Sequence, residues 1–320
     1  MSMTRSETTS TIATTVDFAV FPVTVKRLAR LGENFVRVTF TGDALEHFLA
    51  PGDDQRVKLV LPLAETGLTT FPASAGTSWY TAWRSLPANE QCPLRTYTVR
   101  AHREAERELD IDFVVHGDTG PATRWVNRAR EGDELLVVGP DARTLVQGID
   151  PIGGIEFKPG TAKRVLLAGD ETAAPAICRI LETLPRDTRG QVFIEVASEK
   201  DVLPVAAPGR MTVTWLARDT RGTEHGVALN RAVRTWVSEM IVRPESDVAD
   251  DITDIDVDRE ILWDVPAAPA RGEVQHDLYA WIAGEAGCIK LLRRFLVQES
   301  GMHRDDVAFM GYWRRGRSEN

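Results

Sequence analysis

The pattern of apolar residues changes near residue 150, and this change constrains the fold more than any other feature of the sequence. Before it, segments such as FVRVTFTG (35–42) and LDIDFVVH (109–116) alternate apolar with polar residues, as half-buried antiparallel strands do. After it, short apolar runs are separated by helical stretches, which is typical of a parallel α/β sheet; the runs are RVLLAGD, QVFIEVAS, MTVTWLA and DLYAWIAG. We therefore predict two domains of different architecture.

The first predicted domain is a mostly antiparallel β-barrel over residues 18–150, closed by a short helix that begins at Pro121. The second is a parallel α/β domain over residues 160–320, whose sheet is covered by helices that follow RVLLAGD and WIAGEAG. The Ser/Thr-rich residues 1–17 are interpreted as a disordered tail. Two segments lack a convincing period, and we interpret 64–93 as a long loop and 239–260 as an acidic, solvated insertion.

The charge balance and the cysteines narrow the class of protein. The 38 basic and 47 acidic residues give a net charge of -9, which argues against a general nucleic-acid binder and favours small-molecule partners. The three cysteines are far apart, without a CxxC pair, so neither a disulfide framework nor a zinc site is predicted. Because the sequence also lacks a signal-peptide core and any apolar run of about 18 residues, we expect a cytoplasmic protein without membrane insertion.

The segment LRTYTVR (94–100) places a cation, an aromatic ring and two hydroxyls on one predicted strand. Residues two apart share a face, so Arg95 and Tyr97 point one way, and Thr96 and Thr98 point the other. An arginine can clamp a phosphate, a tyrosine ring can stack on a flat ligand, and a threonine hydroxyl can bond the edge of a heterocycle. The alternative is a half-exposed strand in which Tyr97 is a core residue.

Three turns have the composition of nucleotide-binding loops. In HGDTGPAT (116–123), two glycines allow close approach of the backbone, and the helix that follows directs free N–H groups outward, which suits a pyrophosphate. LLAGDETAAP (166–175) and WIAGEAG (281–287) each end a strand and begin a helix, where doubly wound sheets bind nucleotides. The alternatives are a glycine turn that caps a helix and two routine strand-to-helix turns.

The order of these motifs, RxYT, HGxxGPA, AGDETAxPA and AGEA, followed by a terminal GYWRRG, resembles the siderophore-interacting proteins. These are ferric-siderophore reductases of the ferredoxin-reductase-like flavoprotein superfamily. The resemblance covers Val20 to Gly316 and implies an N-terminal FAD-binding β-barrel and a C-terminal domain that binds NAD(P)H.

The resemblance also implies the site residues. Tyr97 would lie on the isoalloxazine and Thr98 near its reactive edge, which makes these two the candidate catalytic residues, and Arg95 and Thr96 would complete the flavin strand. The diphosphate and adenosine side would be lined by His116, Gly117, Gly120, Pro121, Ala122 and Thr123. The nicotinamide half would use Asp170, Glu171, Thr172, Ala173, Gly284, Glu285 and Ala286, with Tyr312 and Trp313 as terminal aromatics near the flavin.

The implied reaction passes electrons from NAD(P)H through FAD to Fe(III) held by a siderophore, and releases Fe(II). The sequence has no HxxxH, cysteine cluster or EF-hand loop, so the iron is expected to arrive chelated and no metal site is predicted. An anionic chelate would be attracted by Arg314 and Arg315, for which a solvated surface with salt bridges is the alternative.

Two other functions stay open on the sequence. One is a general NAD(P)H-dependent flavoprotein that donates electrons to a ferredoxin or a free flavin, and the other is a non-catalytic flavoprotein that binds siderophores. The choice between NADH and NADPH is also open, because ASEKD offers both Glu199 and Lys200 near the expected ribose. Cys288 is interpreted either as a thiol beside the nicotinamide or as a small buried side chain.

Overall fold

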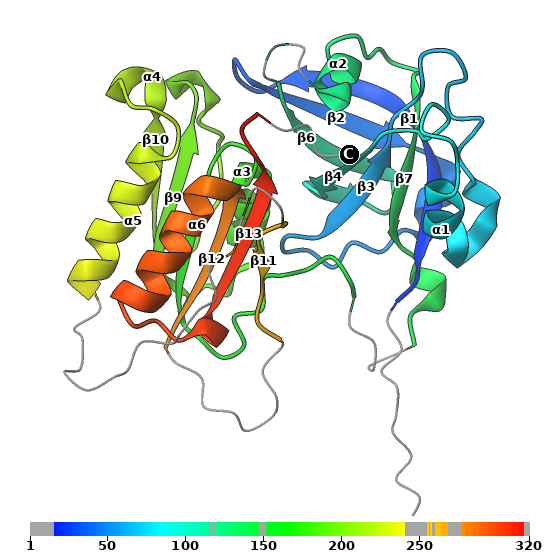
Figure 1. Cartoon of the computed structure of the whole chain (residues 1–320). Coiled ribbons are helices and arrows are strands. Elements are labelled where there is room, and N and C mark those ends of the chain that lie inside the picture. Colours follow the sequence, from blue (N-terminus) through cyan, green and yellow to red (C-terminus); the bar gives the residue numbers. More distant parts are fainter. Residues whose placement is uncertain are drawn as a thin grey trace, which may run out of the picture.

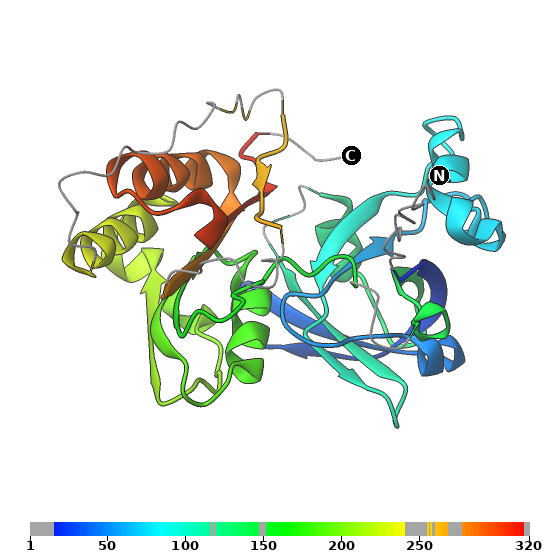
Figure 2. The ribbon, with the colours of Figure 1, turned by 90° about the horizontal axis from the view of Figure 1, so that it is seen from below.

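The computed structural model describes residues 16–115, 117, 120–146, 152–240, 255, 257, 260–267 and 277–316. They form two lobes that lie side by side, a curled β-sheet and a layered α/β unit (Figure 1, Figure 2). His116 and residues 1–15 of the predicted tail lie outside the described residues, so the expectations for them are untested.

The first lobe is a seven-stranded antiparallel sheet in the order β4-β3-β7-β1-β2-β6-β5. Its strands are β1 (Phe18–Arg30), β2 (Phe35–Thr41), β3 (Arg56–Val60), β4 (Leu94–Thr98), β5 (Ala101–Arg103), β6 (Glu108–Val114) and β7 (Glu134–Pro140). Because β4 and β5 form opposite edges, the predicted barrel is a half-barrel. The alternating pattern puts Phe40, Ile111 and Val137 in one core, against which α2 (Pro121–Val126) packs through Ala122 and Val126. Short 3₁₀ turns, η1 (Asp43–His47) and η3 (Ala142–Thr144), complete the lobe.

The segment predicted as a long loop contains local structure. It includes a 3₁₀ stretch, η2 (Ala73–Ser78), and a short helix, α1 (Trp79–Arg84). Trp79 packs with Phe71 in a small apolar cluster beside the half-barrel, and Trp83 Nε1 donates a hydrogen bond to the Cys92 carbonyl at 3.0 Å. The sequence pattern missed this helix because six residues are too few to show a helical period.

The second lobe is a six-stranded sheet in the order β10-β9-β8-β12-β13-β11, parallel except for β11. Its strands are β8 (Arg164–Gly169), β9 (Arg189–Val196), β10 (Arg210–Ala217), β11 (Trp263–Asp264), β12 (Leu278–Glu285) and β13 (Val307–Trp313). The helical segments are α3 (Ala174–Thr183), α4 (Arg218–Arg221), α5 (Val227–Met240), α6 (Ala286–Arg293), the 3₁₀ turns η4 (Glu199–Asp201) and η6 (Arg304–Asp306), and the π-helical turn η5 (Arg294–Glu299).

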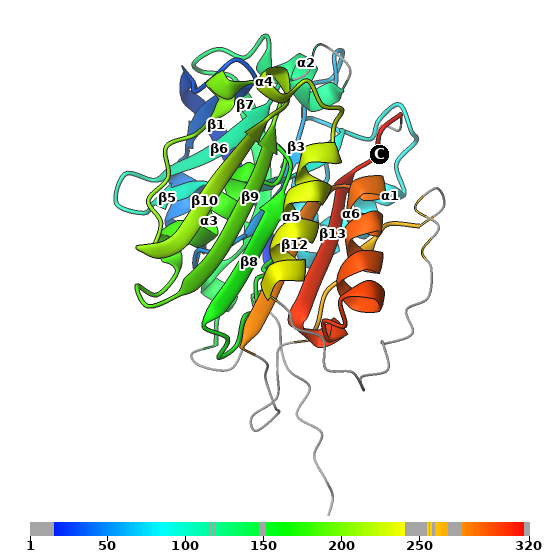
Figure 3. The same cartoon turned by 90° about the vertical axis from the view of Figure 1, so that its left-hand side faces the viewer.

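The helices cover both faces of this sheet. Helix α3 lies on the face toward the half-barrel, and α5 and α6 cover the opposite face (Figure 1, Figure 3). The parallel sheet, with helices after β8 and β12, is the arrangement expected from the sequence. None of the described helices has both the length and the apolarity needed to cross a membrane.

The described end of the acidic insertion is not simply solvated, in contrast to the sequence-based expectation. Ile255 and Val257 pack against the apolar core under α5 and α6. Leu262 is fully buried, and its carbonyl accepts a hydrogen bond from Gly311 N at 2.8 Å. Trp263 then pairs with β13, so the chain that leaves the insertion becomes the edge of the sheet.

Asp54 joins the two lobes through its buried carboxylate. Oδ1 accepts hydrogen bonds from the backbone N–H groups of Glu156 and Phe157, both at 3.0 Å, and Oδ2 accepts one from Trp281 Nε1 at 3.0 Å. Burial raises the pKa of Asp54 to about 6, although these donors oppose the shift. One side chain at the start of β3 therefore fixes both the connecting segment and strand β12.

We expect Asp54→Ala to lower the free energy of unfolding by about 3 kcal/mol, because it leaves buried N–H donors without an acceptor. Urea unfolding at pH 7 measures the change. Asp43→Ala is the control, since the Asp43 side chain is 99% exposed; its surface ion pair contributes less than about 1 kcal/mol. Equal effects of the two substitutions would contradict the assigned role of Asp54.

The pKa of Asp54 also predicts a pH dependence. The folded state binds the proton more tightly than the unfolded chain, so this group makes the unfolding free energy fall as the pH rises from about 4 to about 6. Asp54→Asn removes that contribution. Urea unfolding across this pH range checks the difference between the two slopes.

Candidate functional site

A pocket of about 650 Å³ lies between the lobes and is lined by both of them. The half-barrel contributes Arg56 and Lys58 from β3, residues 94–98 of β4, and Asp112 and Val114 from β6. The α/β lobe contributes Thr172, Pro175, Ile261, Trp263, Gly311, Tyr312 and Trp313. Neither lobe alone encloses this space, so its shape depends on how the two are joined.

Strand β4 brings all four predicted flavin-strand residues, 95–98, to the pocket wall. It is an edge strand, so the pocket reaches both of its faces. On one face, Lys58 lies opposite Thr96, and its Nζ donates a hydrogen bond to Thr96 Oγ1 at 2.6 Å. On the other, the Tyr97 ring packs 4.5 Å from the ring of Phe113 in the core. Tyr97 therefore packs against the core and also lines the pocket, and its contact with a flavin stays a prediction.

The pocket combines cations with aromatic rings. Arg56, Lys58 and Arg95 lie in its wall. The guanidinium of Arg56 sits 4.3 Å above the ring of Trp263, which stacks on Tyr312 at 6.0 Å and 17°. Cations and flat rings in one cavity suit a planar ligand that carries negative charge.

Two buried polar atoms in this wall fit a heterocyclic ligand. Tyr312 Oη and Arg56 Nε have no hydrogen-bond partner among the described residues. Burial raises the pKa of Tyr312, so the phenol stays protonated and can donate. Buried donors normally have acceptors, and the carbonyl oxygens and ring nitrogens of an isoalloxazine would supply them. The residues present therefore fit the flavin of FAD.

The residues predicted for the diphosphate lie away from this pocket, at the start of α2. Gly120 is the N-cap of α2 and Pro121 occupies its first turn. Gly117 has φ +57°, which favours glycine, and its carbonyl accepts a hydrogen bond from Asn127 Nδ2 at 3.0 Å. Ala122 is buried in the half-barrel core. Their assignment to a diphosphate, with that of Thr123, stays a prediction.

The carboxylate of Asp170 connects the two strand-end motifs to the terminal aromatics. Oδ1 accepts hydrogen bonds from Thr172 N at 2.9 Å and Thr172 Oγ1 at 2.5 Å. Oδ2 accepts from Glu285 N at 2.8 Å and Trp313 Nε1 at 2.9 Å. Gly284 has φ +146°, and a Cβ there would lie 2.7 Å from Asp170 Oδ2. A glycine is thus required where strand β12 passes this carboxylate.

The other predicted residues of the α/β lobe do not line the pocket. Glu171 is held by Arg218 at 2.8 Å, and Ala173 and Ala286 are buried. Arg314 donates to the carbonyl of Val257 at 3.0 Å. Arg315 is exposed, and its backbone N–H donates to Glu285 Oε1 at 3.2 Å. Of the residues predicted here, Thr172, Tyr312 and Trp313 line the pocket.

Several residues of this wall were not predicted from the sequence. Arg56 and Lys58 alternate on β3, a signal that would have been informative only once β3 was known to pair with β4. Ile261 and Trp263 follow the acidic insertion, where no periodic pattern pointed to a site.

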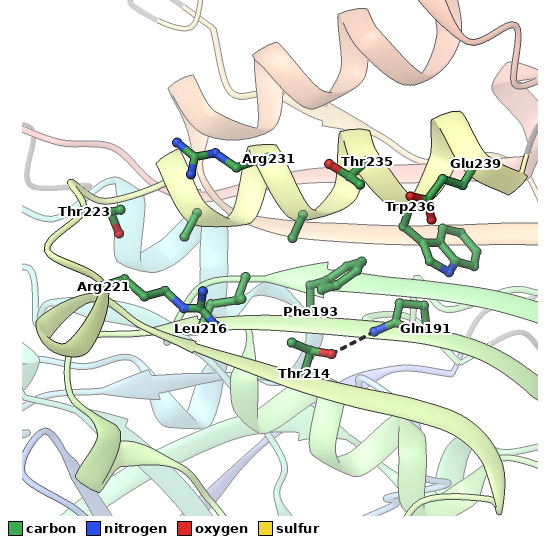
Figure 4. Close-up of a pocket in the computed structure, with 12 residues that line it drawn as sticks. Gln191, Phe193, Thr214, Leu216, Arg221, Thr223, Arg231, Thr235, Trp236 and Glu239 are labelled. Carbon is green, nitrogen blue, oxygen red and sulfur yellow. Dashed lines mark hydrogen bonds between the residues drawn. The ribbon is translucent and has the colours of Figure 1, made fainter.

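A second pocket, of about 560 Å³, lies between α5 and the outer strands β9 and β10 (Figure 4). Phe193 and Leu216 form its floor, with Arg221 and Arg231 toward one end and Trp236 at the other. It is on the sheet face opposite α3, away from the half-barrel, and contains none of the predicted site residues. The pocket between the lobes, which contains several predicted site residues, is therefore the candidate flavin site.

Comparisons with known proteins agree with this arrangement. Residues 24–144 match the family described as siderophore-interacting FAD-binding domain, and residues 162–316 match the family described as siderophore-interacting protein. The ferric vibriobactin reductase ViuB of Vibrio cholerae is 29% identical over 289 residues, which cover 90% of this chain and 87% of that protein.

Solved structures share the whole fold. A siderophore utilization protein from T. fusca is 27% identical with a TM-score of 0.64, covering 95% of this chain and 96% of that one. The ferredoxin reductase in carbazole 1,9a-dioxygenase is 12% identical, with a TM-score of 0.56 over 92% of this chain and 70% of that one. The predicted ferredoxin-reductase-like fold, with an N-terminal FAD-binding β domain, is confirmed.

We expect Tyr97→Leu to weaken FAD binding about fivefold, because leucine fills the space against Phe113 but loses about 1 kcal/mol of ring stacking. Titration of the apoprotein with FAD, followed by flavin fluorescence, measures the affinity. Tyr80→Leu is the matched control, since Tyr80 is 47% exposed and lies outside the pocket. Unchanged affinity in the Tyr97 variant would remove this residue from the flavin site.

Proposed function

Because this chain belongs to the siderophore-interacting protein family, we propose that it is a FAD-dependent ferric-siderophore reductase. It takes a hydride from NAD(P)H and delivers the two electrons one at a time to chelated Fe(III), so that one NAD(P)H releases two Fe(II). The observation that carries the proposal is the pocket between the lobes, where Arg95, Tyr97 and Thr98 face Thr172, Tyr312 and Trp313. The name of the Vibrio cholerae relative, a ferric vibriobactin reductase, supports the same substrate class.

The half-barrel residues position the flavin in this proposal. FAD, when bound, supplies the conversion of a two-electron hydride donor into single electrons for iron. The Arg95 guanidinium gives charge to its anionic part, and the Tyr97 ring supports the isoalloxazine. The Thr98 hydroxyl would lie near the reactive edge of the flavin; the residue is only 7% exposed, so water has little access to it.

The α/β lobe binds the reduced nucleotide at the carboxyl ends of its strands. Asp170 connects the two turns that would receive the nucleotide, because it accepts hydrogen bonds from both of them. The proposed nucleotide-binding residues of these turns are Asp170, Glu171, Thr172, Ala173, Gly284, Glu285 and Ala286. We place the FAD domain within residues 18–150, including the diphosphate residues at the start of α2, and the nucleotide domain within 160–320. The reaction belongs in the cytoplasm, where reduced nicotinamide nucleotides are available.

The direct test is an anaerobic assay of the FAD-loaded protein with ferric chelates. We expect NAD(P)H oxidation that depends on the chelate, with two Fe(II) trapped by ferrozine for each nucleotide oxidised. Turnover with a ferredoxin or free flavin but not with ferric chelates would support a general electron donor instead. Tight chelate binding without turnover would support a siderophore-binding flavoprotein.

We propose that Arg315, which is exposed near the end of the chain, attracts an anionic ferric chelate. Arg315→Glu is expected to raise the KM for a negatively charged ferric chelate several-fold at low ionic strength, because charge at a pocket mouth steers association. The difference should shrink as salt is added. Arg314, which is tied to Val257, would act with it.

Arg294→Glu is the control, since Arg294 is also exposed and has no ion pair with a described residue. FAD content, read from absorbance, should be the same in both variants. If Arg315→Glu and Arg294→Glu had the same KM, Arg315 would have no part in substrate binding.

A further inference from the structure

A cluster of buried charges lies beside Trp313 of the pocket wall, and two of its carboxylates belong to the turn proposed to receive the nucleotide. Asp170, Glu171 and Glu195 are each at most 2% exposed. Arg218 forms ion pairs with Glu171 at 2.8 Å and with Glu195 at 3.4 Å, but none with Asp170. Buried carboxylates are costly without a counter-charge. A cation beside Asp170 would therefore stabilise its ionised form beyond what its four hydrogen bonds provide.

His225, in the loop before α5, is the cationic group that meets Asp170. Its Nε2 lies 3.3 Å from Asp170 Oδ2 and 3.9 Å from Glu171 Oε2, and its side chain is 10% exposed. Among the described residues, no other basic side chain is in ion-pair contact with Asp170. A protonated His225 imidazole therefore balances the negative charge of the Asp170 carboxylate, and a neutral imidazole does not.

The same imidazole contacts the indole that Asp170 holds. The ring of His225 meets the ring of Trp313 edge to face, with centroids 5.2 Å apart and an interplanar angle of 78°. Trp313 Nε1 donates to the same Oδ2 atom of Asp170 that faces His225. The three side chains form one triangle, and Trp313 is its member on the pocket wall.

We propose that His225 is a positioning residue: its imidazolium keeps the Asp170 carboxylate ionised and bonded to the Trp313 indole, so that the nicotinamide side of the pocket is fully formed only while His225 is protonated. This inference rests on the proposed function, because it gives Trp313 a place beside the reduced nucleotide. It makes nucleotide binding, rather than the iron step, the pH-sensitive stage of turnover.

The groups around His225 determine the direction of its titration. Burial by itself lowers the pKa of His225, but Asp170, Glu171 and Glu195 outweigh burial and raise it above its usual value. Conversely, burial raises the pKa of Asp170, and the contacts with His225, Thr172 and Trp313 more than reverse that shift. Each partner therefore favours the ionised form of the other.

The remaining neighbours do not supply a second cation. Glu285, at the start of α6, accepts from Cys288 N at 2.9 Å, so this side of the cluster is acidic as well. Burial raises the pKa of the Cys288 thiol, which stays protonated and neutral beside Asn230. Arg218 is already committed to Glu171 and Glu195.

The sign of the effect follows from linkage. A histidine whose pKa is raised on folding contributes stability that is complete below the unfolded value of about 6.5. That contribution is lost as the pH rises through the folded-state pKa, which lies above 6.5. The Trp313 indole should therefore be held firmly against Asp170 near pH 6, and this contact should weaken toward pH 9.

The primary test follows Trp313 without flavin, nucleotide or chelate. The emission of Trp313 is the difference between the full protein and its Trp313→Phe variant, recorded from pH 6 to pH 9. We expect a transition with a midpoint above 6.5 in the parent protein. His225→Gln, which is neutral at every pH, should show no transition and should resemble the parent protein at pH 9.

Two further variants make the result specific. His303→Gln replaces a histidine that is 49% exposed, and the transition should persist. His225→Lys retains a cation throughout this pH range and should keep Trp313 in contact with Asp170 at pH 9. This variant also tests the positioning role if the glutamine variant does not fold. A parent transition that survives His225→Gln, or no transition in the parent protein, would overturn the inference.

Steady-state kinetics then test whether the positioning role of His225 affects nucleotide binding. At pH 6.5, His225→Gln should raise the KM for NAD(P)H about tenfold, the equivalent of one pKa unit of coupling, with little change in kcat. At pH 9 the two proteins should have similar KM values. The fluorescence result stands or falls independently of ferric-chelate reduction, so failure of the inference can be told apart from failure of the proposed function.

Discussion

The arrangement of the redox pocket depends on one buried carboxylate that accepts hydrogen bonds from three separate segments. Asp170 follows the first strand of the parallel sheet and bonds Thr172 in its own turn, Glu285 at the end of β12 and Trp313 at the end of β13. A buried charge of this kind is tolerated only where its lone pairs are satisfied. Satisfying them brings three chain segments to one edge of the sheet and leaves an aromatic residue on the pocket wall.

A second buried carboxylate fixes the distance between the lobes. Asp54 lies in the turn two residues before the half-barrel strand β3 and accepts hydrogen bonds from the connecting segment and from Trp281 of β12. Strand β3 also contributes Arg56 and Lys58 to the pocket. Two residues that would hold the flavin are thus on the strand that directly follows the contact with the α/β lobe, so the pocket shape and the domain interface depend on each other.

The pocket also shows why an edge strand is useful for a flat ligand. Because β4 has a free edge, the cavity reaches residues from both of its faces, and the pocket wall gains a cation, a ring and a hydroxyl from Arg95, Tyr97 and Thr98. Tyr97 contacts the core ring of Phe113 while it borders the cavity. A side chain supported in this way is held in position before the ligand arrives.

The amino-acid pattern by itself determined the two architectures, because alternating and continuous apolar runs are local properties of the chain. It also drew attention to Arg95, Thr98 and the turn that contains Thr172 through short motifs, whereas Trp313 came from the resemblance to a known family. Only the tertiary structure decided that Trp263 lies beside Arg56 and that His225 lies beside Asp170. Those contacts join residues dozens to hundreds of positions apart in sequence, and they depend on strand order and register, which local periodicity does not encode.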